Sequence, residues 1–351
     1  MVAINHRITL FGFCHLGDMG GETYAAAGKV GMLDLVQGLE GVRDNITQFG
    51  GDPDSVMLFG ESGDGLKTST LMAMPPAKGL FHRAAIQSGP LLLSNPRERA
   101  DASARALLAA LGMSENRVDD IQTIPAKKPV AAMATLSRRQ GSRSRHDAAT
   151  RFAPFVDGKI LPAHLFDPVA TPVWATVPLL MGWNTHEQAF FQMRDPSVFD
   201  LGDAGLRQRV VALAGEQKAS QAIEWYERLY PGKSPTELFF LLATDRDARR
   251  VATILAERRI RQGQAPTYLY LFAWRTPALD GKLVLRRRAK VLGEFIARIP
   301  HQVALRRSGK ADGGRLRRGP AEVDRFHPRP GRCRGGEAFP DARTPVGAGF
   351  Q

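Results

Sequence analysis

Apolar residues near the start of the chain recur at steps of three and four positions, and shorter apolar runs follow them. The recurring pattern predicts an amphipathic helix over residues 33–49, which Gly-Gly-Asp-Pro at 50–53 ends. Short apolar runs at 55–59 and 84–87 have the length of buried strands, and residues 65–74 form a helix between them. The helix face at 33–49 is formed by Leu35, Leu39, Val42, Ile46 and Phe49.

The alternation of strands and helices continues, less regularly, along the rest of the chain. Residues 2–4 fit the end of an earlier strand, and 97–151 have a helical, polar pattern. Because strands joined by helices lie parallel, we expect an α/β fold with a mostly parallel sheet flanked by helices. Further expected elements are a hairpin at 155–162, strands at 177–182 and 267–274, and helices at 206–230 and 235–262.

The composition changes at residue 284 and divides the chain into a body and a tail. The net charge of the chain is +13, yet residues 1–283 hold 32 basic and 29 acidic residues, against 16 and 6 in residues 284–351. The tail also holds 10 Gly and 6 Pro and little apolar periodicity, so we expect a disordered segment after a single domain at 1–283. A nucleic-acid binder that uses this tail is one alternative. The tail carries no known binding module, so we expect no nucleic-acid partner.

Several classes of protein are disfavoured by what the sequence lacks. Cys14 and Cys333 are the only cysteines and no metal-ligand spacing surrounds them, so we expect free thiols, no disulfide framework and no zinc site. The apolar runs are too short to cross a bilayer, which predicts no membrane span. The first residues do not have the pattern of a signal peptide, which favours a cytoplasmic protein.

Residues 59–65 carry the clearest chemical motif. They read Phe-Gly-Glu-Ser-Gly-Asp-Gly and lie directly between a predicted strand and a predicted helix. A sharp turn at this position would lift the hydroxyl of Ser62 above the sheet, as a nucleophile elbow requires. The backbone amide of Gly63 would then face the oxyanion of a tetrahedral intermediate. Without its context such a short motif is more often an ordinary loop serine than a nucleophile.

The context resembles the type-B carboxylesterase family of α/β-hydrolases. The resemblance implies a partial α/β-hydrolase core, a small-molecule carboxylic ester as substrate, no metal or organic cofactor, and a substrate-pocket region at 95–175. It also implies that Glu187 is the acid of a catalytic triad, where the alternative is a solvated loop glutamate. The matching runs are 28–34, 42–46, 49–53, 60–63, 79–84, 87–89, 154–158, 177–187, 267–272 and 280–283.

Three departures from the family pattern concern activity. Asp64 replaces a glycine, and we expect its carboxylate to crowd the turn and to oppose the developing charge on Ser62. The glycine-rich loop that supplies most oxyanion donors in the family has no counterpart before residues 5–7. No histidine follows 280–283 within a few residues. His301 and His327 are the only histidines downstream and either could be a displaced base; His301 is the candidate that we carry forward.

These departures leave two further functional hypotheses open. In one, the reading frame changes near codon 284, and the chain is a truncated or frameshifted pseudoenzyme with weak activity or none. In the other, the chain is a hydrolase-like interaction protein that binds a partner without catalysis. An active serine esterase is the first hypothesis, with Ser62 as nucleophile, Gly63 at the oxyanion, Glu187 as acid and His301 as base.

Overall fold

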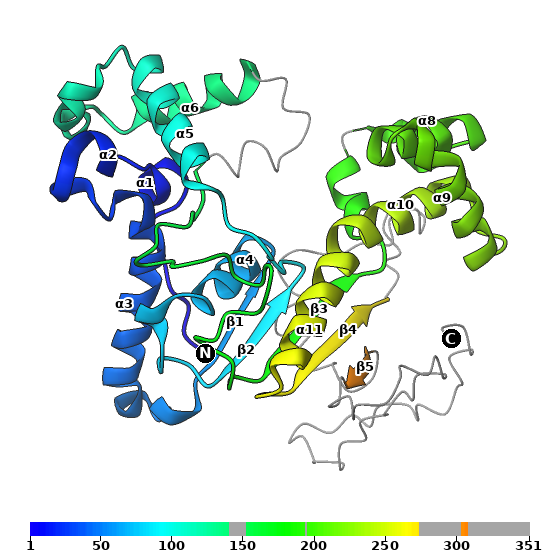
Figure 1. The fold of residues 1–351 in the computed structure, drawn as a ribbon, viewed down its shortest axis with the longest axis horizontal. Coiled ribbons are helices and arrows are strands. Elements are labelled where there is room, and N and C mark those ends of the chain that lie inside the picture. Colours follow the sequence, from blue (N-terminus) through cyan, green and yellow to red (C-terminus); the bar gives the residue numbers. More distant parts are fainter. Residues whose placement is uncertain (140–151, 194, 274–302, 308–351) are drawn as a thin grey trace, which may run out of the picture. The chain divides into compact units, whose positions relative to one another are not determined.

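The computed structural model describes residues 1–139, 152–193, 195–273 and 303–307 (Figure 1). The chain forms two compact units that are interleaved in sequence. The first unit holds Met1–Ile86 and Leu91–Pro178. The second unit holds Gln87–Pro90 and the described residues from Leu179 onward. The chain therefore passes between the units three times.

The first unit is built around a long helix, α3 (Val30–Asn45), and two neighbouring strands, β1 (Met57–Glu61) and β2 (Arg83–Gln87). Helix α4 (Gly63–Leu71) connects the strands. The predicted elements at 33–49, 55–59, 65–74 and 84–87 are thus present, with ends shifted by a few residues. The remaining helices of this unit are α1 (Thr9–Phe13), α2 (Gly17–Gly20), α5 (Arg97–Ala110) and α6 (Lys127–Arg139), with a 3₁₀ segment, η6, at Glu115–Thr123.

The end of the predicted 33–49 helix differs from the expectation. After Asn45 the chain tightens into the 3₁₀ segment η3 (Ile46–Phe49), and Gly50 then takes a left-handed conformation with φ 76°. A 3₁₀ turn has about three residues per turn, so it rotates later side chains away from the α-helical face. Phe49 was predicted on the buried face, but it is 81% exposed.

Two other expectations in this unit are wrong. Residues 2–4 form no strand. The side chain of Ile4 instead packs over Gly38, since a Cβ added to Gly38 would lie 2.7 Å from Cγ2 of Ile4. Residues 155–162 form no hairpin. The carboxylate of Asp157 instead accepts hydrogen bonds from the amides of Lys159 and Leu161, which closes a compact turn.

A buried ion pair joins this turn to the start of α3. The Lys29 ammonium, 1% exposed, lies 3.1 Å from Asp157 Oδ2 and 3.2 Å from the centre of the Phe155 ring. Burial lowers the pKa of Lys29 to about 8, although Asp157 opposes the shift. Nearby Cys14 is a free thiol, and burial raises its pKa to about 12.

The second unit contains the other described strands. Strand β3 (Leu179–Asn184) runs parallel to β4 (Thr267–Phe272) in a register that pairs Leu179 with Thr267, and β4 runs antiparallel to β5 (Val303–Arg307). Helix α11 packs against β4 (Figure 1). The helices of this unit are α8 (Asp203–Ala214), α9 (Glu216–Leu229), α10 (Pro235–Thr244) and α11 (Arg250–Gln262), with a π-helical turn at Asp245–Arg249 between the last two.

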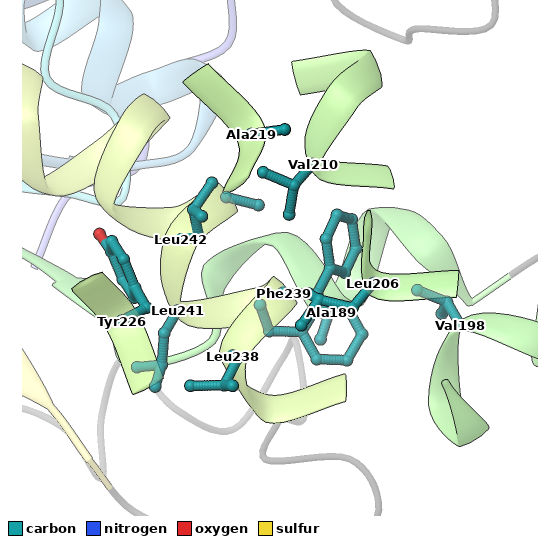
Figure 2. Packing of buried hydrophobic residues seen from close by; sticks show 12 residues of the cluster. Ala189, Val198, Leu206, Val210, Ala219, Tyr226, Leu238, Phe239, Leu241 and Leu242 are labelled. Atoms are coloured by element: carbon teal, nitrogen blue, oxygen red, sulfur yellow. The ribbon is translucent and has the colours of Figure 1, made fainter. Parts of the chain in front are cut away.

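Helix α10 is the centre of the apolar core of the second unit. Ser234 caps it through a reciprocal pair of hydrogen bonds with Glu237, and every residue from 238 to 244 is buried. Figure 2 shows side chains of α8, α9 and α10 gathered in one cluster, with Phe239 close to Leu206. No helix in the described parts of the chain is both long and apolar enough to cross a bilayer.

Candidate active site

Ser62 occupies a strained turn between a strand and a helix. Strand β1 ends at Glu61, Ser62 has φ 56° and ψ −118°, and α4 begins at Gly63. A positive φ costs a residue with a side chain on the order of 1–3 kcal/mol and therefore persists only where the surrounding structure imposes it. The carbonyl of Ser62 accepts a hydrogen bond from the amide of Leu66, at 3.0 Å, which fixes the turn to the first coil of the helix.

The two glycines around the serine, Gly60 and Gly63, have different roles. A Cβ on Gly60 would lie 2.4 Å from the backbone C and O atoms of Asp64, so only glycine lets the strand and helix approach this closely. A Cβ on Gly63 would meet nothing nearer than Lys67 Nζ, at 3.9 Å. The amide of Gly63 belongs to the first helical turn, whose N–H groups have no acceptor within the helix. We call residues 60–64 the serine turn.

Asp64 does not crowd the serine turn, so the expectation from sequence was wrong. Its side chain is 70% exposed and forms an ion pair with Lys67 Nζ at 2.9 Å. The first turn of a helix directs side chains outward unless they cap the helix, and Lys67 three positions later supplies a partner there. A negative charge in the first turn also interacts favourably with the helix dipole.

Glu187 lies three residues after the end of β3, where three hydrogen bonds converge on one of its oxygens. Oε2 accepts from the backbone N and the side-chain Nδ2 of Asn184, both at 2.8 Å, and from Ser88 Oγ at 2.9 Å. Asn184 Nδ2 also lies 3.3 Å from Ser88 Oγ, so the three residues form a closed network. We call Ser88, Asn184 and Glu187 the carboxylate cluster. Three donors on one oxygen hold the carboxylate in a single orientation.

Ser88 reaches Glu187 because the chain bends sharply after β2. Its φ is 54°, and its amide donates to the carbonyl of Gly182 in β3 at 2.8 Å. Sequence analysis assigned no role to Ser88 or Asn184. The signal available for Ser88 was its position at the end of a predicted strand, which resembles the position of Ser62.

The remaining candidates are distributed as follows. Ser62 and Gly63 belong to the first unit and Glu187 to the second, so the approach of the serine to the carboxylate stays a prediction. His301 lies outside the described residues. His186, the residue before Glu187, is 5% exposed, with its ring centre 6.0 Å from that of Phe240.

A serine on a tight strand–helix turn, in a mostly parallel sheet flanked by helices, defines the α/β-hydrolase fold. Comparison with known proteins identifies the family within this fold. The model of the carboxylesterase family matches residues 1–281, and the chain belongs to this family.

Individual relatives agree with this assignment. The para-nitrobenzyl esterase of Bacillus subtilis (strain 168) is 32% identical over 276 residues, which cover 78% of this chain and 53% of the relative. The liver carboxylesterase of Sus scrofa is 30% identical over 312 residues, which cover 78% of this chain and 50% of the relative. The crystal structure of the Geobacillus stearothermophilus carboxylesterase EST55 at pH 6.2 matches with a TM-score of 0.67 and 32% identity, covering 85% of this chain and 59% of that one. The chain spans about half the length of the curated relatives it matches.

Proposed function

We propose that this chain is a serine-dependent carboxylic ester hydrolase with Ser62 as nucleophile. The observation that carries the proposal is the backbone conformation of Ser62, with φ 56° and ψ −118° between β1 and α4. Residues with a side chain hold such angles at a free-energy cost, and they concentrate at active sites. Ser88 also has a positive φ, of 54°, so the assignment to Ser62 rests on this angle together with its place between a strand and a helix in the glycine-flanked motif.

The proposed chemistry is an acyl transfer in two stages. The hydroxyl oxygen of Ser62 forms a bond to the ester carbonyl carbon while a base takes its proton, and the amide of Gly63 donates to the oxyanion. The C–O bond to the alcohol then breaks, the alcohol leaves with a proton, and water releases the acid from the acyl-enzyme. Glu187 is the proposed acid that orients the imidazole base and stabilises its protonated form. His301 is the candidate base.

Two features support a small ester as the substrate and limit the expected rate. The name of the Bacillus relative specifies a para-nitrobenzyl ester, and we infer a small carboxylic ester for this chain as well. We propose that residues 95–175 shape the acyl and alcohol pockets. Because no histidine follows residues 280–283 within a few positions, we expect slow turnover.

The test is active-site labelling of the purified full chain together with an assay on para-nitrophenyl acetate. A fluorophosphonate should label Ser62, as peptide mass spectrometry would show. Ser62→Ala should lower kcat/KM by at least about a thousandfold, because the acyl-enzyme pathway is then lost. The matched control is Ser55→Ala, an exposed serine just before β1, which should keep both labelling and rate.

The outcomes separate the hypotheses. A cooperatively folded chain that neither takes the label nor hydrolyses the ester contradicts the proposal and favours the non-catalytic interaction protein. Label on Ser62 with slow hydrolysis that His301→Gln abolishes supports His301 as the base. Label on Ser62 with a rate unaffected by His301→Gln keeps the nucleophile and rejects that base.

A further inference from the structure

A second polar site lies in the first unit, within residues that the proposed ester chemistry does not use. His15 directly follows α1 and its C-cap residue, Asp18 lies in α2, and Asp101 lies in α5. His15 is 4% exposed. Its Nε2 atom is 3.3 Å from Asp101 Oδ1 and 3.5 Å from Asp18 Oδ1, and these three atoms all lie within 4.8 Å of one another.

The buried imidazole lies within ion-pair distance of the two carboxylates, but in neither contact with the geometry of a hydrogen bond. Neither ring nitrogen of His15 has a hydrogen-bond partner among the described residues, and the same holds for Oδ1 of Asp101. Leaving a buried polar group unsatisfied costs about 1–3 kcal/mol, so native structures rarely do so without a bound water, proton or ion. An unbonded, almost fully buried ring nitrogen between two acceptors therefore indicates an additional group at this point.

The separations identify the kind of group. Zinc binds nitrogen and oxygen ligands at about 2.0–2.2 Å, and tetrahedral geometry then places neighbouring ligand atoms about 3.3–3.5 Å apart. The separations of Nε2 from the two carboxylate oxygens, 3.3 and 3.5 Å, agree with these edges. Calcium and magnesium require six or more oxygen ligands in most sites, whereas an imidazole with carboxylates suits zinc.

We propose that His15, Asp18 and Asp101 bind a zinc ion, with water as the fourth ligand. The spacing in the sequence concealed the site because Asp101 lies far along the chain from the other two residues. The inference is independent of the proposed ester hydrolysis. The ion would tie the segment after α1 to α2 and α5, and its water ligand leaves one coordination position open.

Cationic side chains near His15 and Asp18 compete with the proposed ion for the carboxylate oxygens. Arg97 pairs with Asp18 through Nη2 on Oδ1, and its Nε lies 3.3 Å from Oδ2. When zinc takes Oδ1, Nη2 must leave that oxygen, while Nε stays on Oδ2 and orients the carboxylate. The ring of Phe155 packs against His15, with ring centres 4.6 Å apart, and carries Lys29 over its face, so a second cation is also close. The alternative to a zinc ion between His15 and the two carboxylates is a proton that these groups share.

Cobalt substitution in the full-length chain distinguishes zinc from a proton. The purified protein is stripped with a chelator, dialysed and titrated with Co²⁺. We expect one equivalent to give the intense visible absorption of four-coordinate cobalt, and equimolar Zn²⁺ to remove it. His15→Gln and Asp101→Asn should weaken binding by more than about a hundredfold, the upper end of the loss seen for residues that only support a metal ligand. The control is His6→Gln, a half-buried histidine of the same unit that lies outside the cluster, which should bind cobalt unchanged.

Two results would overturn the zinc site. One is the absence of a four-coordinate cobalt spectrum in the folded parent chain, which leaves the proton as occupant. The other is the same spectrum and affinity in Asp101→Asn as in the parent, which assigns the metal to other residues. Should His15→Gln fail to fold by circular dichroism, Asp101→Asn carries the test, since that side chain is already 24% exposed.

Discussion

The serine turn and the carboxylate cluster are held in place by different means. Ser62 is positioned by the backbone, through a positive φ and a strand–helix contact that tolerates no Cβ at Gly60. Glu187 is positioned by side chains, through donors on Ser88 and Asn184 that meet at one oxygen. The serine turn therefore depends on the lack of a side chain at Gly60, whereas the carboxylate cluster depends on the hydrogen-bond donors of Ser88 and Asn184. Substitutions should affect the two regions in correspondingly different ways.

The largest effect is expected at Gly60. Gly60→Ala places a methyl group 2.4 Å from backbone atoms of Asp64, so β1 and α4 must separate, and we expect a loss of about 2–3 kcal/mol in the free energy of unfolding. Gly63→Ala is the matched control, because its new Cβ meets no atom within 3.8 Å, and it should change stability by less than about 0.5 kcal/mol. Urea unfolding measures both. Equal losses would mean that packing at Gly60 does not hold the turn.

An intermediate effect is expected in the carboxylate cluster. Glu187→Gln keeps the shape but removes the charge from a threefold acceptor, so stability should fall by about 1–2 kcal/mol, and Ser88→Ala should cost about 1 kcal/mol. Because the two residues share a hydrogen bond, the double variant should lose less than the sum of the singles. Glu224→Gln, an exposed glutamate of α9, is the control. Strict additivity would show that Ser88 does not hold the carboxylate.

The smallest effect is expected at Asp64. The carboxylate of Asp64 is largely exposed, so Asp64→Asn should lower stability by about 0.5 kcal/mol or less. Since the carboxylate is turned toward Lys67, kcat/KM for an aryl ester should stay within about threefold of the parent. A rise of more than about tenfold in kcat/KM would restore the interpretation in which Asp64 opposes the charge that develops at Ser62.

The sequence predicted those parts of the fold and site that depend on local pattern. The strand, turn and helix around Ser62 follow from an apolar run, a glycine-flanked serine and a helical pattern, and all three are present. The mostly parallel α/β architecture was also predicted correctly. Glu187 was assigned as the triad acid from a family resemblance; it lies three residues after β3, and its catalytic role stays a prediction.

What the sequence did not predict depends on contacts between distant segments or on exact helix geometry. Ser88 and Glu187 are 99 positions apart, so no local pattern links them. The exposure of Phe49 follows from a change of helix type that hydrophobic spacing does not encode. Asp64 was misjudged because residue type alone does not show which way a side chain in a first helical turn points. Within the tail expected to be disordered, residues 303–307 instead form strand β5 and pair with β4. The rest of the tail and His301 lie outside the described residues.

The Lys29–Asp157 pair limits how far this protein can be shortened. A fragment that retains Ser62 but stops before residue 155 loses both the counterion of Lys29 and the aromatic ring beneath the ammonium. Removing one partner of a buried pair costs about 3–5 kcal/mol, a large fraction of the stability of an ordinary domain. Any attempt to transplant the elbow into another scaffold as a minimal module should therefore carry the chain past Asp157, or first replace Lys29 with an uncharged residue.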